Sequence, residues 1–260
     1  MVEEIFGSTL KYLWVGFCAR DEIASKVVHS TLEISPEHQI IIKNEWKKVL
    51  ERNPSTFDGF LWRYEGFYIH KGKTNIELSP TSYSPHRVLR DIKKQPTRFY
   101  PNPIGVNTVQ ITPDGYIVLG IRKDNGLICV AGAGYVDKKA DNQTSSAEPE
   151  NFFDTMKREC IEELDYGNEM PFKTDEARTM GIIFGRFHTA TMSMYLPLNV
   201  KSKDITIKEP EHSELVFLHD DEDSLERVLK DGSIEGKPCI DEVAGDIGLY
   251  FKYRYKLGLI

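Results

Sequence analysis

One segment of the chain, residues 149–165, combines a stripe of apolar residues with a cluster of acids. The apolar residues recur at spacings of three and four, and they are Phe153, Met156, Cys160 and Leu164. This period predicts an amphipathic helix whose apolar side packs on a sheet. At about 100° per residue, Glu159, Glu162 and Glu163 share an arc that lies away from the stripe. The fold must therefore bury one side of this helix and leave three carboxylates together on the other.

Three carboxylates on one surface repel one another. At an effective dielectric constant of about 20, two unit charges 4 Å apart cost on the order of 4 kcal/mol. One explanation is solvation of an exposed helix, helped by the neighbouring Lys157 and Arg158. The other explanation is a divalent cation, because sites made only of carboxylate oxygens suit Mg²⁺ or Mn²⁺. The helix alone leaves both explanations open.

The residues around the helix resemble the signature of the Nudix hydrolases. The run Arg158-Glu159-Cys160-Ile161-Glu162-Glu163 is similar to the core of the Nudix box, with Cys160 as its buried apolar member, and Glu150 stands eight residues before Arg158 as in that box. The similarity extends from Glu150 to Tyr166. A match at this many positions of one helix is expected by chance in fewer than about one per cent of chains of this length.

Two departures from the box concern its glycines. The first glycine of the box best matches Gly134, which implies an insertion of about ten residues between 135 and 149. Residues 137–146 are polar and include no large apolar side chain, so we expect this part to be mobile. The second glycine is replaced by Asp165, with Gly167 two residues further on. Aspartate enters the left-handed region that ends a helix less easily than glycine does.

The resemblance implies a role for each residue that matches the box. Glu159 and Glu163 would be the principal ligands of Mg²⁺ or Mn²⁺, with Glu162 and the carbonyl of Gly134 as further ligands. Arg158 would orient the acids through a salt bridge to Glu150. No organic cofactor is implied.

Many members of this family take a general base or an extra ligand from a loop beyond the box. The acidic segment 209–214 precedes a predicted strand, and we select Glu211 as the candidate. The alternative is that these acids only solvate a turn. The candidate catalytic residues are thus Glu159, Glu163, Arg158 and Glu211.

The order of predicted elements divides the chain at the proline-rich segment 100–103. Residues 1–102 are predicted to form a β-rich α+β unit, and residues 103–260 an α/β unit with a mixed sheet. For the second unit the resemblance implies a Nudix-like α/β/α sandwich. Capping, turn and periodicity signals predict helices over 36–52, 84–92, 149–165, near 225 and over 246–255, and strands over 60–64, 67–70, 75–78, 105–111, 116–121, 127–130, 181–187, 192–196 and 214–218.

Composition narrows the classes of partner. A net charge of −7 argues against a surface that neutralises nucleic acid or an anionic membrane. The four cysteines form no Cys-x-x-Cys pair, which favours free thiols in a reducing compartment. The acidic start of the chain is unlike a basic signal peptide. We therefore expect a cytoplasmic protein, with a homodimer left open.

Several aromatic and basic side chains have both a functional and a structural interpretation. Trp62, Tyr64 and Tyr68 can stack on a nucleobase, but in short strands such residues more often belong to the core. Arg122 can meet a phosphate or simply end an exposed strand. His188 can reach a cleft or close a hairpin. None of the five enters the candidate catalytic set.

The resemblance implies hydrolysis of a phosphoanhydride bond in a nucleoside diphosphate linked to another moiety. The N-terminal unit faintly resembles the extensions of nucleotide-sugar pyrophosphatases, which makes a nucleotide sugar the substrate to test first. One alternative is a Nudix-fold module that binds a nucleotide without turnover. Another is an isoprenoid-diphosphate isomerase, which needs a positioned cysteine and acid that the sequence does not place.

Overall fold

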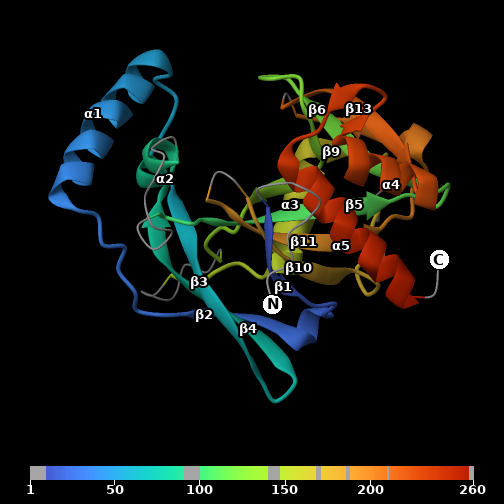
Figure 1. The fold of residues 1–260 in the computed structure, drawn as a ribbon, viewed down its shortest axis with the longest axis horizontal. Helices are drawn as coiled ribbons and strands as arrows, with labels where there is room; N and C mark the ends of the chain where they lie inside the picture. The colour runs from blue at the N-terminus through green and yellow to red at the C-terminus, as the bar shows by residue number, and fades with distance from the viewer. Residues whose placement is uncertain are drawn as a thin grey trace.

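The computed structural model describes residues 10–90, 100–139, 147–167, 171–185, 188–209 and 211–257. Its largest sheet has the strand order β1-β10-β11-β5-β6-β13, with β7 paired to β6 and β8 paired to β5 (Figure 1). The strands of this sheet are β1 (Lys11–Val15), β5 (Ile104–Ile111), β6 (Tyr116–Arg122), β7 (Ile128–Val130), β8 (Ala133–Tyr135), β10 (Arg178–Phe184), β11 (Ala190–Pro197) and β13 (His212–His219). Strands β11 and β5 pair in parallel and the other pairs are antiparallel, so the sheet is mixed.

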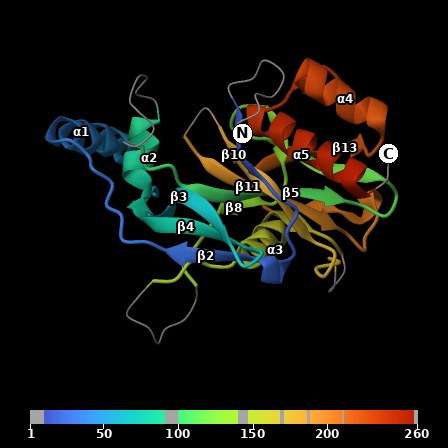
Figure 2. The same ribbon diagram turned by 60° about the horizontal axis from the view of Figure 1, so that its bottom comes forward.

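Helices cover both faces of this sheet (Figure 2). Helix α3 (Phe152–Glu163) packs on one face, while α4 (Glu222–Asp231) and α5 (Asp241–Leu257) pack on the other. Consecutive residues of β6 show the alternation of a strand, because Val118 joins the core under α3 while Ile117 and Leu119 join the core under α4 and α5. The predicted α/β/α sandwich with a mixed sheet is therefore confirmed.

The N-terminal region adds a second, smaller sheet. Its strands β2 (Ile23–Val27), β4 (Lys73–Ser82) and β3 (Phe60–His70) pair in the order β2-β4-β3, and helices α1 (Pro36–Arg52) and α2 (Tyr83–Leu89) accompany them. Helix α1 begins as predicted, with the Ser35 hydroxyl accepting a hydrogen bond from the backbone of His38. The two short strands predicted over 60–64 and 67–70 are one strand, because the chain passes Glu65 and Gly66 through a shift of register instead of a turn.

The first described strand belongs to the larger sheet. Strand β1 pairs antiparallel with β10 at the sheet edge, so the chain enters the large sheet, leaves it to form the small sheet, and returns at β5. At the return, the backbone of Tyr64 donates to the carbonyl of Asn102, 2.9 Å away. The division of the chain at residue 102 stays a prediction. Strand β1 precedes that division but lies in the large sheet, with strands that follow it.

Two short pairs of strands lie in the connections between the larger elements, β9 directly after α3, and β14 and β15 between α4 and α5. Strand β9 (Leu164–Asp165) pairs with β12 (Thr206–Ile207), and β14 (Ser233–Ile234) pairs with β15 (Lys237–Pro238). Within the described residues, none of the helices combines the length and the apolar character needed to cross a membrane.

Candidate active site

Helix α3 places two of its three acids as the sequence predicts: Glu159 and Glu162 lie outside the buried apolar stripe, whereas Glu163, predicted to share their surface, is buried. Phe153, Met156 and Cys160 are buried under the sheet, so the opposite side of the helix faces outward. The helix ends at Glu163, two residues earlier than predicted, because Leu164 is extended and starts β9. The replacement of the box glycine by Asp165 therefore causes no strain. The left-handed conformation falls on Gly167, whose φ is 59° and whose N–H donates to the Asp165 side chain.

Arg158 holds the acids of the helix together. Its guanidinium contacts Glu150 at 3.2 Å, Glu159 at 2.6 Å and Glu162 at 3.3 Å, and it donates to the carbonyl of Tyr135 at 3.1 Å. Five N–H donors in a rigid plane allow one arginine to bridge several oxygens at once. The structure thus shows the Arg158–Glu150 salt bridge that the resemblance implies.

Glu159 lies directly against the backbone of β8. A Cβ added at Gly134 would collide with the Glu159 carboxylate, so this position admits only glycine while the carboxylate stays in place. Burial, together with the charges of Glu162 and Glu163, raises the pKa of Glu159 to about 7 against the opposing effect of Arg158. A cation bound next to Glu159 would therefore stabilise its ionised form.

Glu163 is held differently from the other two acids. It is buried, and it accepts hydrogen bonds from the backbone N–H groups of Gly132 (2.7 Å) and Ala133 (3.1 Å). A third contact, of 2.8 Å, joins its Oε2 to Nε2 of His212. Sequence reasoning missed His212, which stands beside the selected Glu211 and carries no local pattern that marks it.

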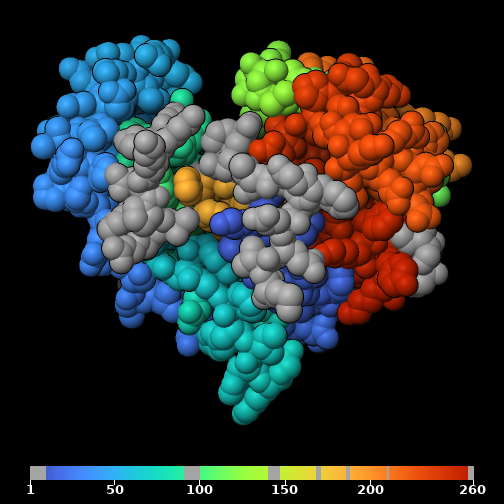
Figure 3. Space-filling view, viewed as in Figure 1, coloured from blue at the N-terminus to red at the C-terminus, as the bar shows by residue number. Residues whose placement is uncertain are grey.

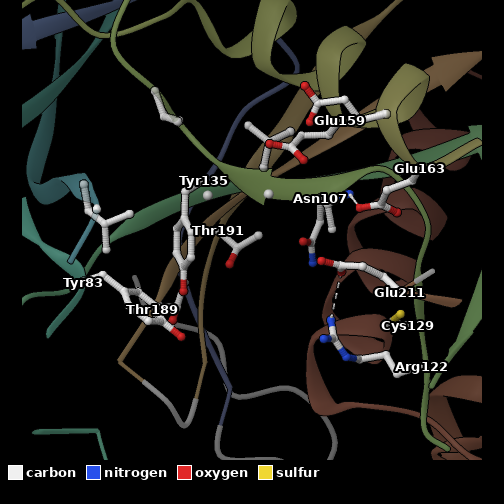
Figure 4. Close-up of a pocket in the computed structure, with 18 of the residues that line it drawn as sticks. Tyr83, Asn107, Arg122, Cys129, Tyr135, Glu159, Glu163, Thr189, Thr191 and Glu211 are labelled. Carbon is white, nitrogen blue, oxygen red and sulfur yellow. Dashed lines mark hydrogen bonds and ion pairs between the residues drawn. The ribbon is translucent and has the colours of Figure 1, made fainter. Parts of the chain in front are cut away.

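Glu211 lies across the cavity from α3 and pairs with Arg122 (Figure 4). Its Oε2 is 3.8 Å from Nη1 of Arg122, and its side chain is 53% exposed. Arg122 also contacts Asp124 at 3.1 Å. The strand-end arginine therefore lines the cavity, in a cluster of mixed charge.

These side chains line a cavity of about 970 Å³. On one side is the α3 wall, formed by Gly134, Arg158, Glu159, Glu162 and Glu163. On the other is the N-terminal wall, formed chiefly by Ser55, Thr56, Phe57, Phe60 and Tyr83. Figure 3 shows the surface hollowed between the blue α1 region and the light-green turn that follows β6. The cavity volume is near the upper end of the range typical of small-molecule sites.

The N-terminal aromatics divide between core and cavity. Trp62 is fully buried and donates to the carbonyl of Asp137 at 3.2 Å, which confirms the core interpretation for this residue. Tyr64 packs against the same core, and Tyr68 lies under the ammonium of Lys26. None of the three lines the cavity, whereas Phe57 does and is 76% exposed. Phe57, Phe60 and Tyr83, and not the three candidates from the sequence, are thus the N-terminal aromatic side chains that line the cavity.

His188 closes the hairpin between β10 and β11. Its backbone N–H donates to the carbonyl of Gly185 at 3.1 Å, its φ is 56°, and its ring stacks on Tyr100 with centroids 3.6 Å apart. The structural interpretation of this histidine is therefore confirmed.

The base of the predicted insertion is paired. The backbone N–H of Lys139 donates to the carbonyl of Glu148, and the backbone N–H of Glu150 donates to the carbonyl of Asp137, both at 2.8 Å. These bonds bring Glu150 back to Arg158 across the extra residues, so the insertion leaves the salt bridge intact. The predicted mobility of residues 137–146 falls largely on 140–146, which lie outside the described residues.

The donor set suits a hard cation in type. Glu159, Glu162 and the segment of Gly134 offer oxygen ligands along one cavity wall, which matches Mg²⁺ or Mn²⁺. Among the described residues, no three His, Cys, Asp or Glu side chains already converge in a metal-binding geometry. Arg158 instead contacts one oxygen of Glu159 and one oxygen of Glu162.

Comparison with known proteins adds little to this geometry. No family model matches the chain, and no curated protein matches it. Among solved structures, Tm1382, described as "a putative Nudix hydrolase", is 16% identical, with 81% of this chain and 96% of that chain covered and a TM-score of 0.36. DR0079 from Deinococcus radiodurans is 17% identical, with 56% of this chain and 79% of that chain covered and a TM-score of 0.36. Likenesses this distant carry no argument, so function must be argued from the site.

Proposed function

We propose that the protein is a hydrolase of the Nudix kind that uses Mg²⁺ or Mn²⁺ to cleave a phosphoanhydride bond. The substrate is a nucleoside diphosphate linked to another moiety. The observation that carries the proposal is the contact of Arg158 with Glu150, Glu159 and Glu162 beside Gly134, all along one cavity. Solvation of an exposed helix does not require this arrangement.

The cation would be held by Glu159 and Glu162 and by the carbonyl of Gly134, with Glu163 offering one oxygen. It would neutralise the phosphates and lower the pKa of a bound water. Glu150 fixes the guanidinium of Arg158, so Arg158 can release an acid to the cation without itself leaving the site. Without a cation, the acidic α3 wall repels a diphosphate.

The side opposite α3 supplies the remaining groups. Glu211 is the candidate to accept a proton from the attacking water, because it lines the cavity and is half exposed. Arg122 would meet a phosphate oxygen when Glu211 turns away from it. The N-terminal wall would hold the moiety beyond the diphosphate, which favours a nucleotide sugar over a bare triphosphate.

The test is a product-release screen over nucleotide sugars, dinucleotides and nucleoside triphosphates with Mg²⁺, Mn²⁺ or chelator. We expect turnover that requires the cation and is highest on a nucleoside-diphosphate sugar. Glu51→Gln removes an acid on the exposed surface of α1, outside the cavity, and should keep the turnover of the wild type. Turnover that persists in chelator would contradict the metal, and nucleotide binding without product would identify a binding module.

A further inference from the structure

The ring of His212 packs against a glycine of the neighbouring strand. His212 begins β13, and its imidazole packs over Gly120 of β6, where an added Cβ would collide with the ring. Only 2% of the His212 side chain is exposed. A buried imidazole loses its water partners, so both ring nitrogens need partners from the protein.

Both ring nitrogens have a partner. Nε2 lies 2.8 Å from Oε2 of Glu163, and Nδ1 lies 3.8 Å from Sγ of Cys129. The Cys129 sulfur is also 3.6 Å from the carbonyl of Gly120. These contacts link β6, β7, β13 and the end of α3 through one buried histidine.

The partners determine which nitrogen carries the proton. Both oxygens of Glu163 already accept backbone N–H bonds, so its contact with His212 requires a hydrogen on Nε2. Burial raises the pKa of Cys129 to about 12, so this residue is a thiol whose one hydrogen can point to the Gly120 carbonyl or to Nδ1. The contacts therefore direct an N–H of His212, on Nε2, at the Glu163 carboxylate.

The three donors leave Glu163 little freedom. A carboxylate has about four acceptor positions, and Gly132, Ala133 and His212 fill three of them. The open position is on Oε1, and Glu163 lines the cavity. Glu162, by contrast, is 49% exposed, and Arg158 holds its side chain at 3.3 Å.

We infer that His212 is a positioning residue that fixes the Glu163 carboxylate with one free oxygen position, and that Cys129 and Gly120 hold the imidazole in the orientation this needs. The role rests on the proposed function, because positioning matters only if Glu163 serves the reaction. The resemblance implies that Glu163 is a principal ligand, and the inference adds what holds this carboxylate in place. A carboxylate with one open position can hold one cation or one water, in one direction.

The hydrogen-bond arrangement can be tested without any substrate. In protein labelled with ¹⁵N-histidine, two-bond proton–nitrogen spectra distinguish the two tautomers of each ring. We expect one histidine with its hydrogen on Nε2, absent in His212→Gln and shifted in Glu163→Gln and in Gly120→Ala. A signal with hydrogen on Nδ1, or one that Glu163→Gln leaves unmoved, would overturn the arrangement.

The positioning role is tested by comparing His212→Gln with His212→Leu. Glutamine keeps an N–H donor near the place of Nε2, whereas leucine fills the space without one. We expect His212→Leu to weaken Mn²⁺ binding and to lower kcat about 10- to 100-fold, as for other groups that orient ligands, and His212→Gln to recover most of both. His219→Leu, at the exposed end of the same strand, is the matched control and should change neither.

The outcomes separate this inference from the proposed function. If wild-type protein binds Mn²⁺ with the dependence on His212 described above but hydrolyses nothing, the proposed function fails and the positioning of Glu163 stands. If hydrolysis occurs but folded His212→Leu and His212→Gln have the same kcat and the same Mn²⁺ affinity, the inference is wrong. Should His212→Leu not fold, Gly120→Ala replaces it in the measurements of Mn²⁺ affinity and kcat, because the added methyl group displaces the His212 ring.

Discussion

The α3 wall of the cavity is built from charged side chains that hold one another, whereas the N-terminal wall presents mainly aromatic and uncharged polar groups. Arg158 and the backbone N–H groups of β8 fix the acids of the first wall. Phe57, on the second wall, is mostly exposed to solvent. Under the proposed function, the α3 wall would carry the chemistry and the N-terminal wall would select the substrate. Substitutions in the two walls should therefore act on different kinetic constants.

The largest expected effect is on the acids of α3. Glu159→Gln and Glu163→Gln should each lower turnover at least about a hundredfold, the scale for loss of a positioned catalytic group. Steady-state kinetics with Mg²⁺ and with Mn²⁺ would measure this. Normal activity in either folded variant would return that acid to a solvating role.

The same two variants should differ in stability. Glu163→Gln sets an amide N–H₂ among three N–H donors, and such a mismatch costs about 1–3 kcal/mol of unfolding free energy. Glu159→Gln removes a charge whose burial is unfavourable, as its raised pKa shows, so its melting temperature should hold or rise. Equal melting temperatures would contradict the difference between the two carboxylates.

The next effect tests whether Arg158 organises the α3 wall. Arg158→Met keeps the length of the side chain and loses every contact to Glu150, Glu159 and Glu162. We expect kcat to fall about 10- to 100-fold, because the acids lose their common partner. Arg158→Lys should restore little, since a lysine cannot bridge the same oxygens. Full activity in Arg158→Lys would mean that charge alone suffices.

A smaller effect should follow from the N-terminal wall. If Phe57 stacks on the substrate, Phe57→Ala should raise KM about fivefold with kcat nearly unchanged, which corresponds to about 1 kcal/mol of contact. Tyr255→Ala is a matched control, because Tyr255 is 75% exposed on α5 and Phe57 is 76% exposed. An unchanged KM and an unchanged ranking of substrates would remove the selecting role from this wall. Trp62 is unsuitable for this test because it is fully buried.

The smallest effect lies outside both walls. The Asp221 side chain caps α4 by accepting from the N–H of Ser224 at 2.8 Å, so Asp221→Ala should cost about 1 kcal/mol of unfolding free energy and leave kcat and KM unchanged. The Ser224 backbone bond lowers the pKa of Asp221 in the folded protein. The difference between wild type and variant is therefore complete above the pKa of an unfolded aspartate, about 3.9, and shrinks as pH falls further. Urea unfolding at several pH values would measure it.

Local patterns predicted much of this molecule. The period of apolar residues placed α3 and its buried face, and turn signals placed the β5–β6 hairpin. Both features depend on residues within about one helix or one turn of each other, where spacing alone limits the geometry. The Arg158–Glu150 salt bridge was expected from the resemblance to the Nudix box.

The rest depends on contacts between distant segments. His212 reaches Glu163 because β13 pairs with β6, and nothing near residue 212 reveals that register. Phe57 reaches the cavity because the small sheet docks beside β5. Glu65-Gly66 looks like a turn in sequence, yet the pairing of β3 with β4 continues past it. Tertiary pairing decided each of these positions.

Strand β1 has a consequence for how the chain can be divided. Because it forms the edge of the large sheet beside β10, the residues between β1 and β5 form a looped excursion with both of its ends anchored in the same body. A fragment starting at residue 103 would lack that strand and expose the unpaired edge of β10, a template for aggregation. The same cut would remove the whole N-terminal wall of the cavity, so the α3 wall would lose both the strand at the edge of its sheet and the surface that faces it.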